Sequence, residues 1–258
     1  STKKPKRLRR LKKVKYLICD LSKKKKLKTI LKNKYSYVVN LSGYVDHSNK
    51  IKTTQSHNYG CKNLSNLLLE HMPISFVQMG SSLEYGMLNR KTNEKSNCRP
   101  QSTYGIAKFK ATTHLLNLYD KYNFPVTVLR LFQTYGPYQE LNRVIPISIN
   151  NCLNGRTFNC SDGKQYRDFI FIDDLINVIF KSFSNSKSRG QIFNIGSGKA
   201  TKIRDVINLI KKFVGDGNPL FGKIKLRKEE SKFSVANLRK TKKYLKWQPK
   251  ISLKKGIK

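Results

Sequence analysis

Three side chains in the middle of the chain could move a proton together. Tyr104 and Lys108 lie four residues apart in STYGIAK (102–108), so on a helix they share one face. A free phenol has a pKa of about 10, and a positive charge one turn away favours its ionised form. Ser81 lies in GSSLEYG (80–86), directly after the apolar run SFVQM. These residue types could serve a general acid and base.

The Tyr-x-x-x-Lys spacing is a weak signal by itself. With 13 tyrosines in so lysine-rich a chain, about two such pairs are expected by chance. An exposed lysine one turn from a packing tyrosine fits the same pattern. The interpretation therefore depends on the elements that position the pair.

Short apolar runs alternate with longer amphipathic segments from residue 16 to residue 214. The apolar runs are rich in Val, Ile, Phe and Tyr and predict strands over 16–19, 37–40, 75–79, 126–131, 169–172 and 191–195. The amphipathic segments predict helices over 58–71, 103–122, 173–184 and 203–214. Strand–helix–strand alternation predicts an α/β fold with a parallel sheet covered on both faces.

Small and polar residues follow several of these predicted strands. Asp20, residues 41–43 and residues 80–82 each come directly after an apolar run, as do 132–137 and 196–198. Ligands of parallel sheets bind beyond the carboxyl ends of the strands. We therefore expect a binding site at this edge, with Ser81 in it.

Six motifs occur in the order expected of one family. They are GSSLEYG (80–86), YGIAK (104–108), VLRLFQTYGPYQ (128–139), YRDFIFIDDL (166–175), FNIGSGKATKIRDVINLI (193–210) and YLKWQPKISLKKGI (244–257). Together they resemble the extended short-chain dehydrogenase/reductase family, the NAD-dependent sugar-nucleotide epimerases and dehydratases. The resemblance covers the chain from about residue 14 to its end.

The resemblance implies a Rossmann-like, doubly wound parallel sheet that lacks its first βαβ unit, with a smaller C-terminal substrate domain. Residues 1–135 would form a partial NAD-binding domain. Residues 136–258 would mainly bind substrate, with the strands near 169–172 and 191–195 returning to the Rossmann sheet.

The resemblance also assigns chemistry to the three side chains. Tyr104 would be the general acid/base at a sugar hydroxyl, and Lys108 would favour its phenolate and bind the nicotinamide ribose. Ser81 would hydrogen-bond the reacting oxygen at sugar C4. The cofactor implied is NAD or NADP, and the substrate is a nucleoside-diphosphate sugar.

Further residues follow by motif. Asp20 and Leu21 match the segment that meets the adenine, and Leu41, Ser42 and Gly43 in VVNLSG match the turn beneath the cofactor. The expected substrate contacts are Ser82, Gln133, Arg143 and Arg167, the last suited to a diphosphate.

Three other assignments have a structural alternative. Asp20 could instead be a helix N-cap. Asn58 matches a family asparagine but could only stabilise the backbone. Arg130 could be a ligand or a buried ion-pair partner.

Two differences from the family pattern bear on which reaction is expected. Gln133 stands where the family usually has Asn beside the substrate, which leaves the sugar pose open. Ser82 and Leu83 occupy the positions where the 4,6-dehydratases carry Asp-Glu. Without an acid for the departing C6 hydroxyl, we expect 4-epimerisation or 4-keto reduction.

The largest departure lies before the first glycine, Gly43. The family begins with a strand and a G-x-x-G-x-x-G turn that binds the NAD pyrophosphate at a helix N-terminus. About forty residues of strand–helix–strand are therefore expected to be missing, as in a truncated reading frame or fragment. We expect this chain to bind NAD weakly.

Charge and composition exclude other classes. The net charge is +38, from 53 Lys+Arg and 15 Asp+Glu, and it would attract phosphate. However, aromatic residues do not alternate with the basic run and no nucleic-acid-binding motif is present, so no nucleic-acid partner is expected. No apolar run approaches the ~18–20 residues of a membrane span.

The cysteines and histidines of the chain show no pattern typical of a metal site. Five cysteines without a C-x-x-C pair and four scattered histidines give no zinc pattern, so no metal is expected. Free thiols fit a reducing cytosol and predict a cytoplasmic protein. Family resemblance implies a homodimer through the helices at 58–71 and 103–122. A non-catalytic relative that binds a nucleotide sugar remains the alternative.

Overall fold

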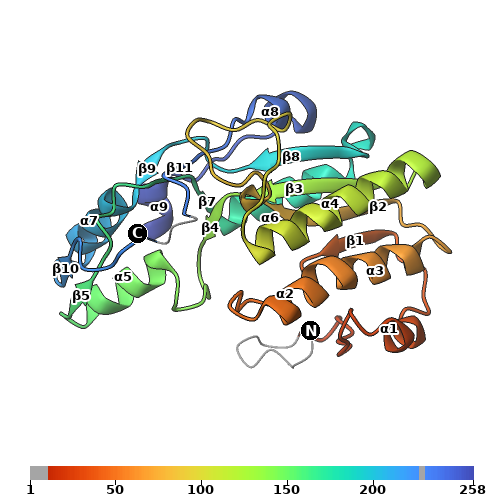
Figure 1. Ribbon diagram of the computed structural model, residues 1–258, viewed down its shortest axis with the longest axis horizontal. Coiled ribbons are helices and arrows are strands. Elements are labelled where there is room, and N and C mark those ends of the chain that lie inside the picture. Colours follow the sequence, from red (N-terminus) through yellow and green to blue (C-terminus); the bar gives the residue numbers. More distant parts are fainter. Residues whose placement is uncertain (1–10, 227–229) are drawn as a thin grey trace.

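The centre of the molecule is a four-stranded parallel sheet. A computed structural model describes residues 11–226 and 230–258. The sheet contains β1 (Tyr37–Asn40), β2 (Ser75–Ser81), β3 (Val126–Leu131) and β8 (Gln191–Ile195), in the order β1-β2-β3-β8 (Figure 1). Every neighbouring pair is parallel. The predicted α/β class with a parallel sheet is therefore confirmed.

The side chains of β2 pack alternately against layers on the two faces of the sheet. All seven residues of β2 are buried. Phe76 packs into a cluster with Leu64 and Leu115, whereas its neighbour Val77 packs into a second cluster with Trp247. Successive side chains of a strand point to opposite faces, so a strand covered on both sides is buried along its whole length and is mainly apolar. The polar Gln78 is accommodated because its side chain hydrogen-bonds to Asn40 and to Met79 O.

Helices cover the two faces. The first face carries α1 (Lys24–Ile30), α2 (Lys50–Thr54), the π-helical turn η1 (Gln55–Tyr59), α3 (Gly60–Leu68) and α4 (Thr103–Tyr122). The second face carries α6 (Ile172–Phe183) and α8 (Arg239–Leu245). Figure 1 shows α3 and α4 side by side over the sheet. This two-sided cover is the doubly wound arrangement that the resemblance implied.

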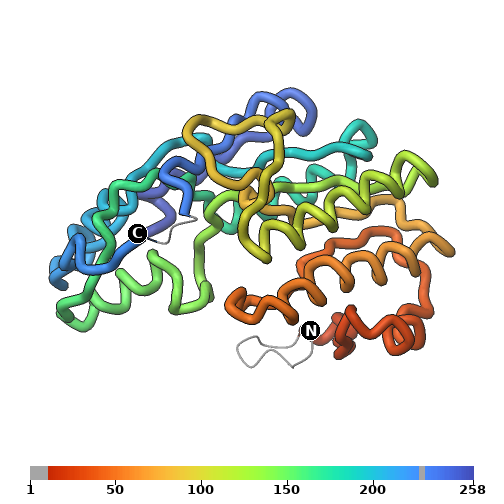
Figure 2. The backbone as a smooth tube through the Cα atoms, viewed as in Figure 1, coloured from red at the N-terminus to blue at the C-terminus, as the bar shows by residue number. Residues whose placement is uncertain are grey.

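A smaller group of elements lies beside the sheet. It includes α5 (Val144–Leu153), α7 (Ile203–Val214), α9 (Leu253–Ile257), β5 (Thr157–Asn159) paired with β10 (Asn218–Leu220), and the three-stranded β11 (Phe233–Ser234), β6 (Tyr166–Arg167) and β9 (Thr201–Lys202). Its core contains Ile145, Val206 and Ile210. Figure 2 shows the chain leaving the sheet after β3, returning for β8 and leaving again for α7.

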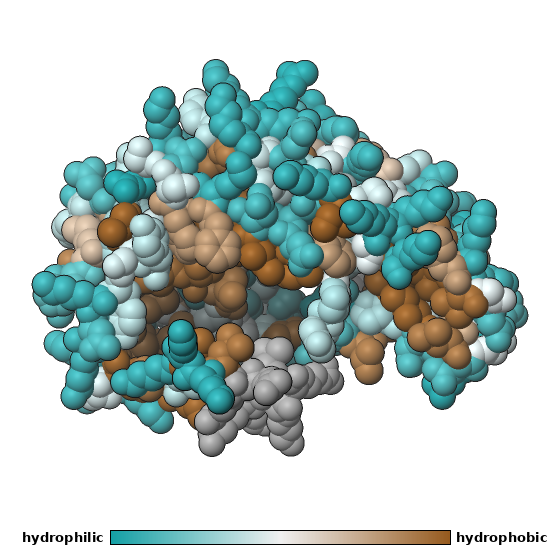
Figure 3. Space-filling view, turned by 180° about the vertical axis from the view of Figure 1, so that it is seen from behind, coloured by the Kyte–Doolittle hydropathy of each residue, from teal (hydrophilic) through white to brown (hydrophobic). Residues whose placement is uncertain are grey.

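Short elements complete the fold. β4 (Gln133–Tyr135) pairs with β7 (Phe169–Phe171), and two 3-10 turns are η2 (Ser82–Glu84) and η3 (Ser186–Ser188). From behind, Figure 3 shows a hollow lined by hydrophobic side chains and rimmed by hydrophilic ones. Among the residues described, no helix has the length and apolar character needed to cross a bilayer.

Most predicted elements occur at the predicted residues. β1, β3, β8, α4 and α7 have the predicted bounds, and β2 runs two residues further than predicted, to Ser81. The helix predicted over 58–71 instead begins earlier, through α2 and η1, and ends at Leu68.

One predicted strand is absent, and another is present but lies in a different sheet from the predicted one. Residues 16–19 form no strand, because no described segment lies beside them as a hydrogen-bonded neighbour; only Cys19 of this run is buried. β7, predicted to return to the main sheet, pairs with β4 in a separate two-stranded sheet. β8 does return to the main sheet. The division into an NAD domain and a substrate domain stays a prediction.

Candidate active site

Ser81 stands where β2 turns into η2. Its side chain is buried, and its Oγ accepts a hydrogen bond from Leu83 N at 3.2 Å. Glu84 closes the same turn, since its Oε1 accepts from Ser81 N at 2.8 Å. This reciprocal capping box fixes the backbone at the carboxyl end of the strand, where ligands of parallel sheets bind.

Tyr104 and Lys108 lie on the first two turns of α4. The helix begins there because Ser102 caps it, with Ser102 Oγ accepting from Gly105 N at 3.1 Å. Lys108 is buried, its Nζ donates to Met79 O at 2.7 Å, and Nζ lies 5.8 Å from the centre of the Tyr104 ring. An ammonium has three donors, so further N–H groups of Lys108 can serve a ligand. The structure thus brings Ser81, Tyr104 and Lys108 together.

Burial dominates the electrostatics of the pair. It raises the pKa of Tyr104 to about 12, and hydrogen bonding to Ser81 acts in the opposite direction. It lowers the pKa of Lys108, which the negative charge of Glu84 counteracts. Both shifts disfavour charge inside the site. Burial therefore favours the neutral phenol of Tyr104 and opposes the charge of Lys108, which Glu84 helps to retain.

Two histidines that the sequence reasoning did not assign flank the tyrosine. The His47 ring is stacked on the Tyr104 ring with centroids 4.0 Å apart, and the His57 ring meets it edge-on at 4.8 Å. His57 Nε2 also lies 3.2 Å from Tyr44 O. Their positions depend on how residues 41–58 fold over α4, so no local motif could have indicated them.

His57 should make folding sensitive to acid. Burial lowers its pKa to about 3, so below about pH 6.5 the unfolded chain binds a proton that the folded chain does not. The stabilisation of the fold by neutral, buried His57 is therefore fully present above that pH and is lost as the pH falls. Between about pH 7.5 and about pH 5.5 we expect it to cost about 1.4 kcal/mol of unfolding free energy. Urea unfolding of wild type and His57→Gln at both pH values would measure this, and equal pH dependence in both proteins would contradict it.

The predicted cofactor residues lie in two places. Asp20 Oδ1 accepts from Ser22 N at 2.9 Å, and the N-cap of α1 is Lys23, so Asp20 forms a local turn rather than the helix cap. The Leu21 carbonyl accepts from Asn63 at 3.0 Å, which ties this segment to α3.

The turn after β1 lies nearer to the tyrosine. Leu41 is exposed, and the backbone N–H and hydroxyl of Ser42 both donate to Asn40 Oδ1. Gly43 packs so closely on the His57 ring that a Cβ there would collide with it. Through His57, this glycine turn therefore contacts the surroundings of Tyr104.

The predicted substrate residues are more dispersed. Ser82 is half-buried in η2, and Gln133 is exposed in β4. Arg143 is exposed, and its charge acts on both His47 and Tyr104. Arg167 is buried, with Nη1 donating to Ser231 O at 2.8 Å and Nη2 to Glu230 Oε1 at 2.6 Å. Within residues 11–226 and 230–258, no hydrogen bond or ring contact joins Arg167 to Tyr104 or to its neighbours His47 and His57.

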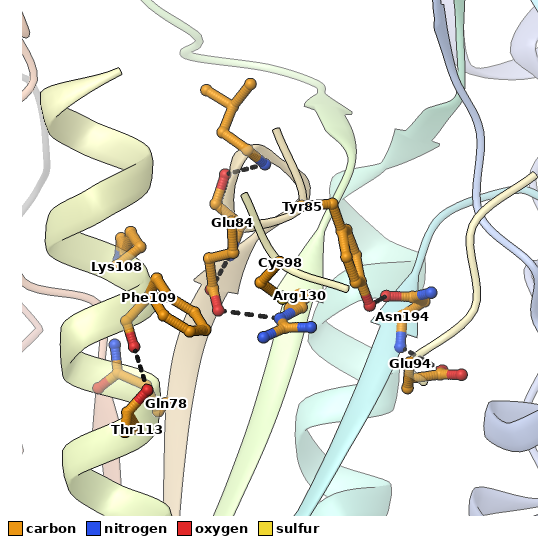
Figure 4. Close-up of polar contacts among 12 residues, drawn as sticks. Gln78, Glu84, Tyr85, Glu94, Cys98, Lys108, Phe109, Thr113, Arg130 and Asn194 are labelled. Atoms are coloured by element: carbon orange, nitrogen blue, oxygen red, sulfur yellow. Dashed lines mark hydrogen bonds and ion pairs between the residues drawn. The ribbon is translucent and has the colours of Figure 1, made fainter. Parts of the chain in front are cut away.

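A buried ion pair settles one alternative that the sequence left open. Arg130 Nε lies 2.9 Å from Glu84 Oε2, and the side chains are 2% and 0% exposed. Figure 4 shows this pair between α4 and β8. Arg130 is therefore the ion-pair member, and Glu84 is its partner, which the sequence reasoning missed. The Ser81-x-x-Glu84 spacing is a capping-box signature and was the available signal, but it does not show that the second carboxylate oxygen meets Arg130.

The residues present fit one end of a dinucleotide. Tyr104, Lys108 and Ser81 form a buried polar set at a strand end, and nearby Asn58 Oδ1 and His57 Nδ1 are buried without a partner among the described residues. Such atoms can accept or donate to a ligand. The assignment of individual residues to parts of the cofactor stays a prediction.

Comparison with known proteins gives a consistent result. The family model described as "NAD dependent epimerase/dehydratase family" matches residues 1–196. The uncharacterized UDP-glucose epimerase YtcB of Bacillus subtilis is 30% identical over 190 residues, which are 73% of this chain and 60% of that protein. The CDP-abequose synthase of Salmonella typhimurium is 35% identical over 136 residues, 50% of this chain and 45% of that protein.

A solved structure supports the fold. UDP-glucose 4-epimerase of Thermotoga maritima, determined with UDP-glucose, aligns with a TM-score of 0.87 at 24% identity, over 93% of this chain and 80% of that one. The chain spans less than two thirds of the length of both curated relatives, at 60% and 45%.

Proposed function

Because the chain belongs to the NAD dependent epimerase/dehydratase family, we propose that it epimerises or 4-keto-reduces a nucleoside-diphosphate sugar. The observation that carries this proposal is the position of Tyr104 and Lys108 on α4, beside Ser81 at the end of β2. The named activities of the curated relatives, a UDP-glucose epimerase and a CDP-abequose synthase, lie in the same substrate class.

Each of the three side chains has a proposed role. Tyr104 takes a proton from, or returns it to, the hydroxyl at sugar C4. Ser81 Oγ hydrogen-bonds the same oxygen and polarises the C4 carbonyl when it forms. Lys108 holds a positive charge near the phenol and lowers the cost of its ionisation. Ser81 and Lys108 are buried and Tyr104 is half-buried, which limits the access of water to the reacting oxygen.

The cofactor is proposed to be NAD, or NADP, and when bound it accepts and returns a hydride at C4. Lys108 and the turn Leu41–Gly43 would hold its nicotinamide ribose end, and Asp20 and Leu21 the adenine end. We therefore propose that residues 1–135 form the part of the chain that binds the cofactor. Residues 136–258 would mainly hold the sugar nucleotide, through Gln133 at the border and Arg143 and Arg167 within.

Ser82 and Leu83 favour epimerisation or reduction over dehydration. Neither side chain can protonate a departing C6 hydroxyl, and Ser82 is half-buried in η2 directly after Ser81. Ser82 is therefore proposed to contact the substrate without acting as an acid.

Binding without turnover is the second candidate. Arg167 favours it, because its guanidinium lies buried among polar partners in the part of the chain proposed to hold the sugar nucleotide, apart from the proton-transfer residues. Nucleotide-sugar affinity would then remain and catalysis would not.

One experiment separates the two candidates. The protein is incubated with UDP-, GDP-, CDP- and dTDP-hexoses in turn, with NAD or NADP in excess, and products are identified by proton NMR. Inverted or reduced C4 signals with one nucleotide class are the result expected for an enzyme. Calorimetric binding of a sugar nucleotide without product supports the second candidate, and the lack of both binding and product rejects both.

The homodimer predicted from the sequence also remains a proposal. Its contact surface would be the outer faces of α3 and α4, where a groove is lined by Tyr59, Lys62, Phe109 and His114. Two copies related by a twofold axis would form a four-helix contact there.

A further inference from the structure

Glu84 is an acidic side chain buried beside the site, and the proposed reaction gives it no role. Its side chain is 0% exposed, in a turn that directly follows Ser81. A buried carboxylate is costly unless it is paired and hydrogen-bonded. Both of its oxygens have partners on different elements, so its position is fixed from two sides.

The first oxygen holds the turn that presents Ser81. Oε1 accepts from Ser81 N at 2.8 Å and completes the capping box of η2. Gly80 makes room for it, since a Cβ there would lie 2.7 Å from Oε1 and 3.1 Å from Arg130 Cγ. Any side chain at residue 80 would push the carboxylate away, and the backbone N–H of Ser81 would lose its acceptor.

The second oxygen is anchored through an arginine. Oε2 accepts from Arg130 Nε at 2.9 Å, and the guanidinium lies 4.5 Å from the centre of the Tyr85 ring. Tyr85 Oη in turn donates to Asn194 Oδ1 at 2.7 Å. Figure 4 shows this series running from Glu84 through Arg130 and Tyr85 to β8. The carboxylate is therefore held by the core of the sheet.

The charge of this carboxylate acts on both candidate catalytic groups. Burial lowers the pKa of Lys108, and the Glu84 charge opposes that effect. Burial raises the pKa of Tyr104, and Glu84 raises it further against the hydrogen bond from Ser81 and the charge of Arg143. Glu84 thus favours a protonated lysine and a neutral tyrosine together.

We propose that Glu84 is a positioning residue of the active site, whose carboxylate, fixed by Arg130, orients Ser81 and places a negative charge beside Lys108 and Tyr104. This inference rests on the proposed function for its catalytic meaning. The other titratable or charged groups that face Tyr104 are His47 and His57, Arg143 and Lys108.

The test is the titration of the Tyr104 phenol in Glu84→Gln. Glutamine keeps an oxygen acceptor for Ser81 N and removes the charge. Protein labelled with ¹³C at the tyrosine ring carbon next to oxygen is titrated by NMR, and Tyr104→Phe identifies the signal. We expect Tyr104 to titrate at least ~0.5 pH units lower in Glu84→Gln than in wild type.

Glu94→Gln is the matched control. Glu94 belongs to the same polar network, through Asn194 N at 2.8 Å, but no effect of its charge on Tyr104 is found. It should leave the Tyr104 titration unchanged. An unchanged or higher Tyr104 titration in Glu84→Gln, or an equal change in Glu94→Gln, overturns the proposal.

Two further points keep the test decisive. If Glu84→Gln does not fold, Glu84→Gln/Arg130→Met removes both charges of the pair and should show the same lowering. The titration needs neither NAD nor a sugar, so a wild-type protein without turnover would overturn the proposed function while this measurement still decides the role of Glu84.

Discussion

Replacing Tyr104 with phenylalanine is expected to lower turnover of the nucleotide sugar by about 100-fold or more. The substitution removes only the hydroxyl that exchanges the proton. The ring contacts stay, because the His47 and His57 rings pack against the aromatic carbons at 4.0 and 4.8 Å between centroids. Folding should therefore be nearly unaffected, and substrate affinity should change little.

The measurement compares kcat of wild type and Tyr104→Phe with the sugar nucleotide that the NMR survey identifies, and thermal melts of both. Tyr122→Phe is the control, since Tyr122 lies at the end of the same helix and is 53% exposed. It should retain wild-type turnover. A loss of less than tenfold in Tyr104→Phe would show that this phenol is not the acid/base.

The sequence predicted the sheet well where local pattern and tertiary environment agree. β3 and β8 are mainly apolar and lie largely buried between two layers, so their bounds follow from the sequence pattern. Residues 16–19 have the same composition but form no strand. A strand requires a hydrogen-bonded neighbour, and composition alone does not show whether one is present.

Some residues of the candidate site could likewise be predicted from local spacing, and others could not. Tyr104 and Lys108 could be paired from spacing alone, because a helix fixes residues four apart on one face. Glu84 could not, since its inward direction is set by the capping box and by Arg130 on another strand. His47 reaches Tyr104 across a long loop, and no periodicity connects the two. Long-range packing decides such contacts.

Arg167 shows what a motif leaves open. YRDF suggested a diphosphate ligand, but the guanidinium already binds Glu230 Oε1 at 2.6 Å and two backbone carbonyls. Burial lowers the pKa of Arg167, and the Glu230 charge opposes this. A substrate diphosphate would therefore have to compete with Glu230 for this guanidinium.

Arg130→Met is expected to reduce the unfolding free energy by about 3–5 kcal/mol, because it leaves the Glu84 carboxylate buried without its cation. Burial alone would lower the pKa of Arg130, but Glu84, with smaller contributions from Tyr85 and Cys98, raises it overall, so the cation depends on its acidic partner. Urea unfolding of Arg130→Met, Glu84→Gln and the double variant forms a complete cycle.

The double variant Glu84→Gln/Arg130→Met separates the effect of the ion pair on stability from its effect on the positioning of Ser81. With both charges gone, the methionine fills the space and the glutamine still accepts from Ser81 N, so most of the lost stability should return. Simple addition of the two single losses would contradict the coupling. If the double variant is stable but turns over substrate more slowly than wild type, the pair is kept for the charge it places beside Tyr104 and Lys108 rather than for the fold.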